Sequence, residues 1–180
     1  MTELLYLTDS YVREFTATVV ERTDEGVVLD RSAFYPQGGG QPSDKGILLD
    51  DEGRQYMVGR VQRVKGKVLH KIEGDAPEAG DSVKGVVDWD RRHELMRTHT
   101  ALHILCGVIW RDYGASVTGG NMDLLKARMD FELESMSAAF SDEVEAKINA
   151  EVAAARPVRI DILPREEAFQ IPDLIRTKIN

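Results

Sequence analysis

Short runs of apolar, mostly β-branched residues fill the first half of the chain, and glycine-containing turns separate them. Runs of this kind between turn residues are typical of β-strands. The predicted strands are 16–20, 27–29, 46–49, 56–58, 58–64, 68–72 and 82–87. Because the strands are short and closely spaced, they predict a small β-barrel or a folded-over sheet.

The pattern changes from strand-like to helical after residue 88. Apolar residues recur at near-helical spacing over residues 91–110, at Leu95, Leu102, Leu105 and Ile109. Asp88 or Asp90 can cap the start of this helix, and Gly114 can end it. We therefore expect one long helix here.

Strand and helix patterns follow one another in the remaining residues. The predicted elements are an alternating strand at 126–133, a helix from Ser141 to Pro157 with Asp142 and Glu143 in its first turn, a strand at 158–163 and a helical turn at 164–169. The predicted fold class is α+β. A small β-barrel-like domain is expected at residues 1–90, and an α+β domain with a mainly antiparallel sheet and helices at residues 91–180.

Composition narrows the possible functions. The chain has 180 residues, of which 42% are hydrophobic and 30% charged, as in an ordinary soluble globular protein. The net charge of −8 argues against a broad basic surface for non-specific nucleic-acid binding. Two local basic groups remain, although a solvated charged face is the ordinary interpretation of each residue: Arg91, Arg92, Arg97 and Arg111, and Lys65, Lys67 and Lys71.

The sequence also indicates a compartment. No stretch is long or apolar enough to span a bilayer, and the first residues lack the basic start and apolar run of a signal peptide. Cys106 is the single cysteine, so no internal disulfide can form. We expect a cytoplasmic protein in a reducing setting, with no membrane partner.

Two histidines four residues apart, His99 and His103, are the first candidates for chemistry. On a helix they lie one turn apart on the same face, where both rings can bind one metal ion. Most such pairs are ordinary helix-face or core residues. Because this helix is mostly apolar, we expect both rings to face the interior or a cleft. Cys106 shares roughly the same stripe, either as a third ligand or as a small buried residue.

A glycine-rich stretch, FYPQGGGQPSD, occupies residues 34–44. Three consecutive glycines cost conformational entropy on folding, so they need a reason. Either a tight connection between strands or a close approach of the backbone to a ligand would supply one, and Gln41 offers a donor and acceptors. The stretch is neither a phosphate-binding Walker loop nor a dinucleotide fingerprint. Farther along, Arg128 and Asp130 can form a surface ion pair.

Three motifs, taken together and in this order, resemble those of the alanyl-tRNA editing proteins. These proteins, called AlaX, are free-standing relatives of the editing domain of alanyl-tRNA synthetase. The motifs are FYPxGGGQPxDxG at 34–46, DxxRRxxxMRxHTxxH at 88–103 and ARxDF at 127–131. The resemblance covers most of the chain, and the N-terminal β-domain makes it similar to the medium-length form.

The resemblance implies a specific activity. Family members hydrolyse the ester that joins a wrong amino acid, chiefly serine and sometimes glycine, to tRNA(Ala). They hold zinc with the helical His-x-x-x-His and a later Cys-x-x-x-His or close variant. His99 and His103 correspond to the first ligand pair, and Gln41 and Thr100 to catalytic positions. The residues expected to contact the substrate or the acceptor end of tRNA(Ala) are Gly38, Gly39, Gly40, Arg91, Arg92, Arg97 and Arg128.

These residue types suit ester hydrolysis with a ribose hydroxyl as the leaving group. Zinc can activate water or polarise the carbonyl, and it can instead bind the amino group and position the substrate. Backbone N–H groups of the glycine-rich stretch can bind the developing oxyanion. The main alternative is a non-catalytic tRNA- or protein-binding module of the same fold, and a different metallohydrolase is a third.

The sequence departs from the family pattern towards its C-terminus. No histidine follows His103, no cysteine follows Cys106, and residues 173–179 read as the middle of a domain. We therefore expect a C-terminally shortened protein whose editing domain is incomplete. Zinc is then expected to be weakly held or absent, with little deacylase activity. A missing strand would also leave a free sheet edge, where a homodimer can form.

Overall fold

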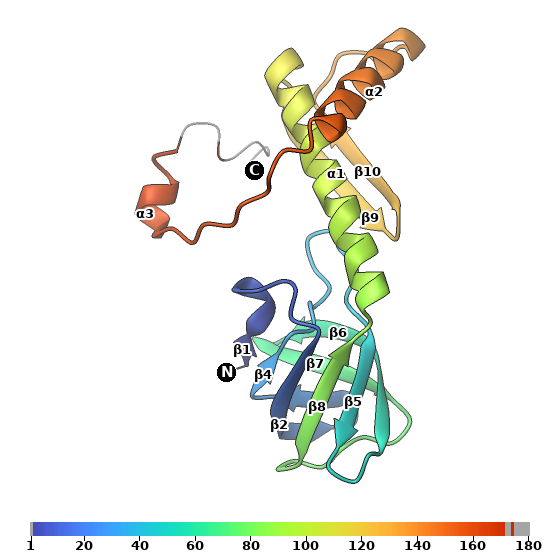
Figure 1. Cartoon of the computed structure of the whole chain (residues 1–180), viewed down its shortest axis with the longest axis vertical. Coiled ribbons are helices and arrows are strands. Elements are labelled where there is room, and N and C mark those ends of the chain that lie inside the picture. The colour runs from blue at the N-terminus through green and yellow to red at the C-terminus, as the bar shows by residue number, and fades with distance from the viewer. Residues whose placement is uncertain (1, 172–173, 175–180) are drawn as a thin grey trace. The chain divides into compact units, whose positions relative to one another are not determined.

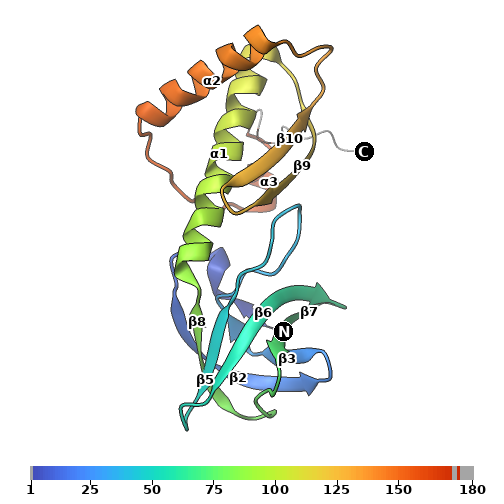
Figure 2. The ribbon, with the colours of Figure 1, turned by 90° about the vertical axis from the view of Figure 1, so that its right-hand side faces the viewer.

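The structure is a computed structural model that describes residues 2–171 and 174, and these fold as two compact units (Figures 1 and 2). The first unit is formed by the chain up to Arg97 together with Met122–Lys126. The second is formed by Thr98–Asn121 and the chain from Ala127 onwards. The predicted domain ranges of 1–90 and 91–180 stay a prediction.

Six antiparallel strands close into a barrel in the first unit. Their order around the barrel is β2 (Glu14–Thr23), β3 (Gly26–Leu29), β7 (Lys67–Glu73), β6 (Gln55–Val64), β5 (Gly46–Asp50) and β8 (Ser82–Val87). Closure pairs every strand on both sides and removes free edges. The α+β fold with a small barrel is thereby confirmed, although the two predicted strands 56–58 and 58–64 are one strand, β6.

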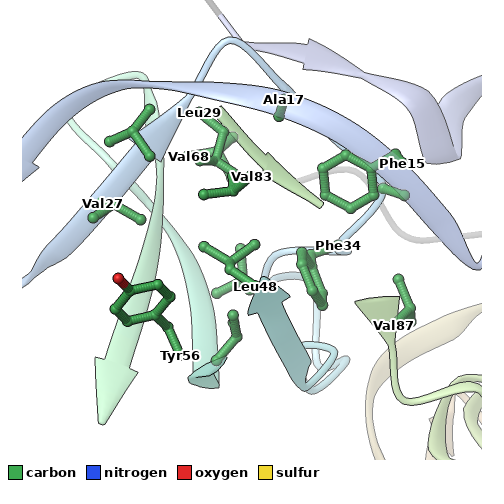
Figure 3. Packing of buried hydrophobic residues seen from close by; sticks show 14 residues of the cluster. Phe15, Ala17, Val27, Leu29, Phe34, Leu48, Tyr56, Val68, Val83 and Val87 are labelled. Carbon is green, nitrogen blue, oxygen red and sulfur yellow. The ribbon is translucent and has the colours of Figure 1, made fainter. Parts of the chain in front are cut away.

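The barrel interior is filled by side chains that point inward from alternate strand positions (Figure 3). In the described residues this core contains 14 buried hydrophobic residues, including Phe34, Leu48 and Val61, which have no exposed surface. Gly85 makes room for the Phe15 ring, because a Cβ at residue 85 would lie 2.4 Å from that ring. Fully burying each large apolar side chain contributes roughly 1.5–3 kcal/mol, so the barrel can supply its own stability.

Two polar side chains, Ser32 and His70, are fully buried in this core. His70 Nδ1 lies 3.2 Å from the Val27 carbonyl oxygen, and His70 Nε2 lies 2.8 Å from Ser32 Oγ. Ser32 Oγ in turn accepts from the Phe34 N–H at 3.1 Å. Burial lowers the pKa of His70 from 6.5 to about 4, so the ring is neutral at neutral pH.

Short elements cover one side of the barrel. β1 (Glu3–Leu4) pairs in parallel with β4 (Arg31–Ser32), and the 3₁₀ helix η1 (Leu5–Leu7) follows β1. This helix places the Tyr6 ring edge-on against Tyr35, with 5.2 Å between the ring centroids. None of these three elements was predicted from the sequence, because each is too short to show a periodic pattern of apolar residues.

The second unit is built from helices and one hairpin. Its elements are the second part of α1 (Trp89–Tyr113), most of β9 (Val117–Asp123) and of β10 (Lys126–Phe131), α2 (Ala138–Ala153) and α3 (Arg165–Ala168). β9 and β10 form a two-stranded sheet. The predicted ends of α1 are confirmed, because Asp88 accepts from the Arg91 N–H at 3.1 Å and Gly114 has φ +65°. The helical turn at 164–169 is confirmed as α3.

Two predicted elements of the second unit are wrong. α2 begins at Ala138 rather than at Ser141, because Ser137 caps it by accepting from the Phe140 N–H at 3.1 Å. Asp142 and Glu143 therefore lie beyond its first turn. Residues 158–163 form no strand, because no described strand pairs with them. The predicted continuation at 173–179 lies outside the described residues, except for Leu174. No helix in the described part is long and apolar enough to cross a membrane.

Candidate functional site

The two helical histidines face each other closely. His99 and His103 lie one turn apart on α1, with ring centroids 4.8 Å apart and the two Nε2 atoms 3.2 Å apart. Two nitrogens that bind one tetrahedral zinc at about 2.0–2.1 Å lie roughly 3.3 Å apart, so the observed separation fits two ligands of one ion. The same separation also allows an N–H···N hydrogen bond between neutral rings.

Electrostatics favour the neutral form of His99. Partial loss of hydration around the otherwise exposed ring, and then the charge of His103, lower the pKa of His99. A neutral ring is the form that binds a metal ion. The lowered pKa therefore favours the form of His99 that can act as a ligand.

The expectation that both rings face the interior or a cleft is wrong. His99 and His103 are exposed, whereas Val108 and Ile109 on the same helix are buried. At 100° per residue the buried Val108 falls 180° from His99 and 140° from His103, so at this level the buried side of the helix is turned away from both rings. Cys106 is a half-buried free thiol rather than a core residue.

The residues that the structure describes do not complete a metal site around the two histidines. No group of three or more His, Cys, Asp or Glu side chains there can hold a metal ion, with or without Cys106. His99 and His103 thus fit as half of a tetrahedral site.

The glycine-rich stretch folds as a closed loop in the first unit. Gly38 and Gln41 exchange backbone hydrogen bonds of 3.1 and 3.0 Å, and Gly39 and Gly40 between them have φ values of +59° and +76°. Residues with a side chain rarely adopt such φ values, so the geometry of the turn accounts for glycine at these two positions. Gly38 has no such φ, and a Cβ there would meet nothing within 4 Å. Gly38, Gly39 and Gly40 are exposed, and Gln41 is partly exposed.

A buried ion pair holds the base of this loop. Asp44 accepts from the Tyr35 N–H at 2.6 Å, and the Asp44 N–H donates to the Tyr35 carbonyl at 3.0 Å. Arg92 binds both Asp44 oxygens through Nε at 2.9 Å, and its Nη2 also contacts the carboxylate. The exposed fractions of the two side chains are 6% and 2%.

The rest of the Arg92 guanidinium is also occupied. It donates to the carbonyls of Ser10 at 2.9 Å and Ala33 at 2.6 Å. This burial contradicts the predicted contact between Arg92 and tRNA, because the side chain has a structural role instead. Asp44 belongs to the glycine motif, but its role was not predictable from the sequence, because its partner Arg92 lies 48 residues away in the chain.

The other predicted residues are spread over both units. Arg91 donates to the Ser43 carbonyl at 3.2 Å, next to the loop base. Arg97 and Thr100 are exposed on α1. Arg128 is 74% exposed and forms the expected ion pair with Asp130 at 3.2 Å.

One open cavity of about 500 Å³ lies elsewhere in the first unit. It is lined by the β2–β3 turn and by residues 72–79, and no predicted site residue contributes to it. The lining is mainly polar and includes Arg22, which forms ion pairs with Asp75 and Glu78. The cavity therefore gives no support to the predicted site.

Comparison with known proteins defines the class of this chain. Residues 3–91 match the family described as tRNA synthetases class II (A). The chain is 41% identical over 171 residues to the alanine–tRNA ligase of Pyrobaculum aerophilum, covering 93% of this chain but 19% of that enzyme. Most of this chain is thus similar to about a fifth of a much longer alanine–tRNA ligase.

Much fuller matches come from shorter relatives. The alanyl-tRNA editing protein AlaX-M of Methanosarcina barkeri is 43% identical over 174 residues, which cover 93% of this chain and 72% of that protein. AlaX-M of Saccharolobus solfataricus is 39% identical over 178 residues, covering 98% and 75%. The chain belongs to the AlaX-M family of alanyl-tRNA editing proteins.

Proposed function

We propose that this protein is a trans-editing aminoacyl-tRNA deacylase. Its substrates are tRNA(Ala) molecules mischarged with serine and, second, with glycine, and it acts at the acceptor end. Membership of the AlaX-M family supports alanyl-tRNA editing in general. The observation that carries the hydrolytic chemistry is the 3.2 Å separation of His99 Nε2 and His103 Nε2, which suits two ligands of one zinc ion.

The proposed reaction is hydrolysis of an ester. Water adds to the carbonyl carbon, the bond to the ribose oxygen breaks, and the products are the free amino acid and tRNA with its hydroxyl restored. A bound zinc would supply a Lewis acid at this centre. His99 and His103 would hold it. In the family pattern Gln41 stands at a catalytic position, and its amide offers a donor and an acceptor for a serine hydroxyl, which alanine lacks.

The exposure of other candidate residues supports further parts of the proposal. The left-handed turn at Gly39 and Gly40 leaves the loop backbone exposed next to Gln41, so loop N–H groups can approach a substrate oxygen. Arg97 and Arg128 are exposed cations that can contact phosphates, and Thr100 lies one residue from His99. Because the described residues supply only two ligands, zinc is expected to be held weakly.

The test is a single-turnover assay with excess protein, with and without added Zn²⁺, on Ser-tRNA(Ala) and Ala-tRNA(Ala). We expect serine to be released selectively and faster with zinc. His99→Ala and His103→Ala should each remove the zinc-dependent rate. His93→Ala is the matched control, because His93 is an exposed histidine of the same helix that stacks on Trp89.

Two results would contradict this proposal. Equal release of serine and alanine would remove the editing specificity. Binding of tRNA without any hydrolysis, at all zinc concentrations, would favour the alternative of a non-catalytic binding module. Stoichiometric zinc retained after exhaustive dialysis would not contradict the deacylase proposal. It would contradict only the expectation that zinc is held weakly.

A further inference from the structure

Two cations lie directly opposite each other on the β6–β7 hairpin. Arg60 on β6 is the register partner of Lys71 on β7. Their neighbours Val61 and His70, also partners, are buried in the barrel, so Arg60 and Lys71 point to the outer face. Like charges directly opposite on neighbouring strands destabilise a sheet. Such a pair therefore needs a reason beyond folding.

A β-bulge creates this pairing. The register of β6 and β7 shifts between Val58 and Arg60, so that Gly59 is the extra residue. Without the bulge, Arg60 would share the inward parity of Val58, which is 1% exposed. Bulges re-aim side chains and are retained as specific features. Here the bulge turns an arginine outward, onto the same face as a lysine.

No carboxylate of the described residues neutralises the pair. Neither Arg60 nor Lys71 has an ion pair within 4 Å, whereas Lys67 on the same hairpin binds Glu21. Glu73 is the acid nearest in register, but its carboxylate lies against Gly59, where a Cβ would be 2.4 Å from its Oε1. In a chain of net charge −8, uncompensated cations are conspicuous. Lys65, exposed at the hairpin turn, adds a third.

The same strand anchors the glycine-rich loop. The Gln37 N–H donates to the Val61 carbonyl at 2.9 Å, and Gln37 forms a parallel bridge with Gln62. Gln62 is two residues from Arg60 and has the same outward parity. The cation pair and the start of the loop are therefore placed by adjacent residues of β6.

We propose that the outer face of the β6–β7 hairpin, centred on Arg60 and Lys71, binds the phosphate backbone of tRNA. A row of phosphates supplies the negative charge that this face lacks, and its binding would turn the repulsion into two favourable contacts. This proposal rests on the proposed function for the identity of the RNA. It gives the barrel a direct part in holding the substrate.

The experiment measures the affinity of uncharged tRNA(Ala) against salt concentration for the wild-type protein, Arg60→Gln, Lys71→Gln and the double variant. Each single change should lower the slope of log K against log salt by about 0.7–0.9, and the double by about twice that. At about 0.1 M salt each lost contact should weaken binding roughly five- to tenfold. The urea midpoint of each variant should be equal to or higher than that of the wild type, because repulsion is removed.

The matched control is Lys84→Gln, an exposed lysine of β8 that is already paired with Glu14 at 2.7 Å. Its salt slope should equal that of the wild type. An unchanged slope in the double variant, or an equal loss in the control, would overturn the proposal. A lower urea midpoint together with weaker binding would also overturn it, as would wild-type binding to anionic lipid vesicles but not to tRNA.

The two proposals fail separately in this design. If the wild type hydrolyses Ser-tRNA(Ala) selectively but the double variant has an unchanged salt slope, the deacylase proposal stands and the hairpin proposal is wrong. If the double variant has a reduced salt slope but the wild type hydrolyses nothing, the hairpin proposal stands and the deacylase proposal is wrong.

Discussion

The two units are stabilised in different ways. The barrel unit closes all six of its strands and buries 14 hydrophobic residues around a hydrogen-bonded Ser32–His70 pair. The buried core of the second unit, in the described residues, comprises Ile109, Ala115 and Val144, beside a two-stranded sheet. A two-stranded sheet is marginally stable without further packing.

This difference separates the candidate site residues by the kind of support that they have. The glycine-rich loop is closed by buried polar groups of a strong core, whereas the two histidines stand on an exposed helix face. Precision at the loop therefore comes from the barrel. The positions of the two histidine rings are set by the regular spacing of the helix and by any ligand that the rings bind.

The largest expected effect is on the barrel, from Arg92→Met. The change leaves the Asp44 carboxylate buried and unpaired, which should lower the free energy of unfolding of the barrel by about 3–5 kcal/mol. Urea denaturation followed by circular dichroism measures this loss. Arg31→Met is the matched control, since the Arg31–Glu3 pair has a contact of 2.9 Å but its side chains are 48% and 59% exposed. A midpoint shift as large in the control would show that burial is not the cause.

The next effect is a dependence of barrel stability on acid pH. His70 has a pKa of about 4 when folded and 6.5 when unfolded, so above pH 6.5 the ring is neutral in both states. As the pH falls from 6.5 to about 4 the unfolded state alone takes up a proton, and the barrel should lose up to roughly 3 kcal/mol. Urea midpoints at a series of pH values measure this loss. In His70→Gln the slope over this interval should be shallower; an unchanged slope would assign the loss to carboxylates.

The smallest effect concerns the second unit. Ser137→Ala removes the cap of α2 and should cost about 1 kcal/mol. Native-state hydrogen exchange should show this loss in the amides of α2 but not in those of β6 or β7. Ser141→Ala is the control, because Ser141 lies inside the helix and should change exchange very little. Equal protection changes in both units would mean that they unfold together.

The sequence was sufficient for elements with a local cause. β-branched runs between turns predicted the barrel strands, and Asp88 and Gly114 predicted both ends of α1. β9 was missed because its central residues, Thr118 to Asn121, carry no apolar alternation. Ser137 was missed because Ser141, with acidic residues after it, has the same local appearance as a cap.

The site was less predictable because its decisive contacts are not local. The spacing of His99 and His103 predicted that the rings would meet, and their rings do lie together. The exposure of the two rings depends on which other elements pack against α1, and the sequence of the helix itself does not specify this packing. The burial of Arg92 depends on Asp44, Ser10 and Ala33, which lie 48 to 82 residues away in the chain.

The contacts of His70 have a direction. When Nδ1 carries the proton and donates to Val27, Nε2 must accept from the Ser32 hydroxyl, whose oxygen accepts from the Phe34 N–H. The hydrogen bonds then all run in one direction, from the Phe34 N–H through the Ser32 hydroxyl and the His70 ring to the Val27 carbonyl. A substitute at residue 70 must accept at one end and donate at the other, as a glutamine amide can. Leucine, though similar in bulk, would leave a hydroxyl and a carbonyl without partners, so this position limits sequence drift through the order of its hydrogen bonds rather than through its volume.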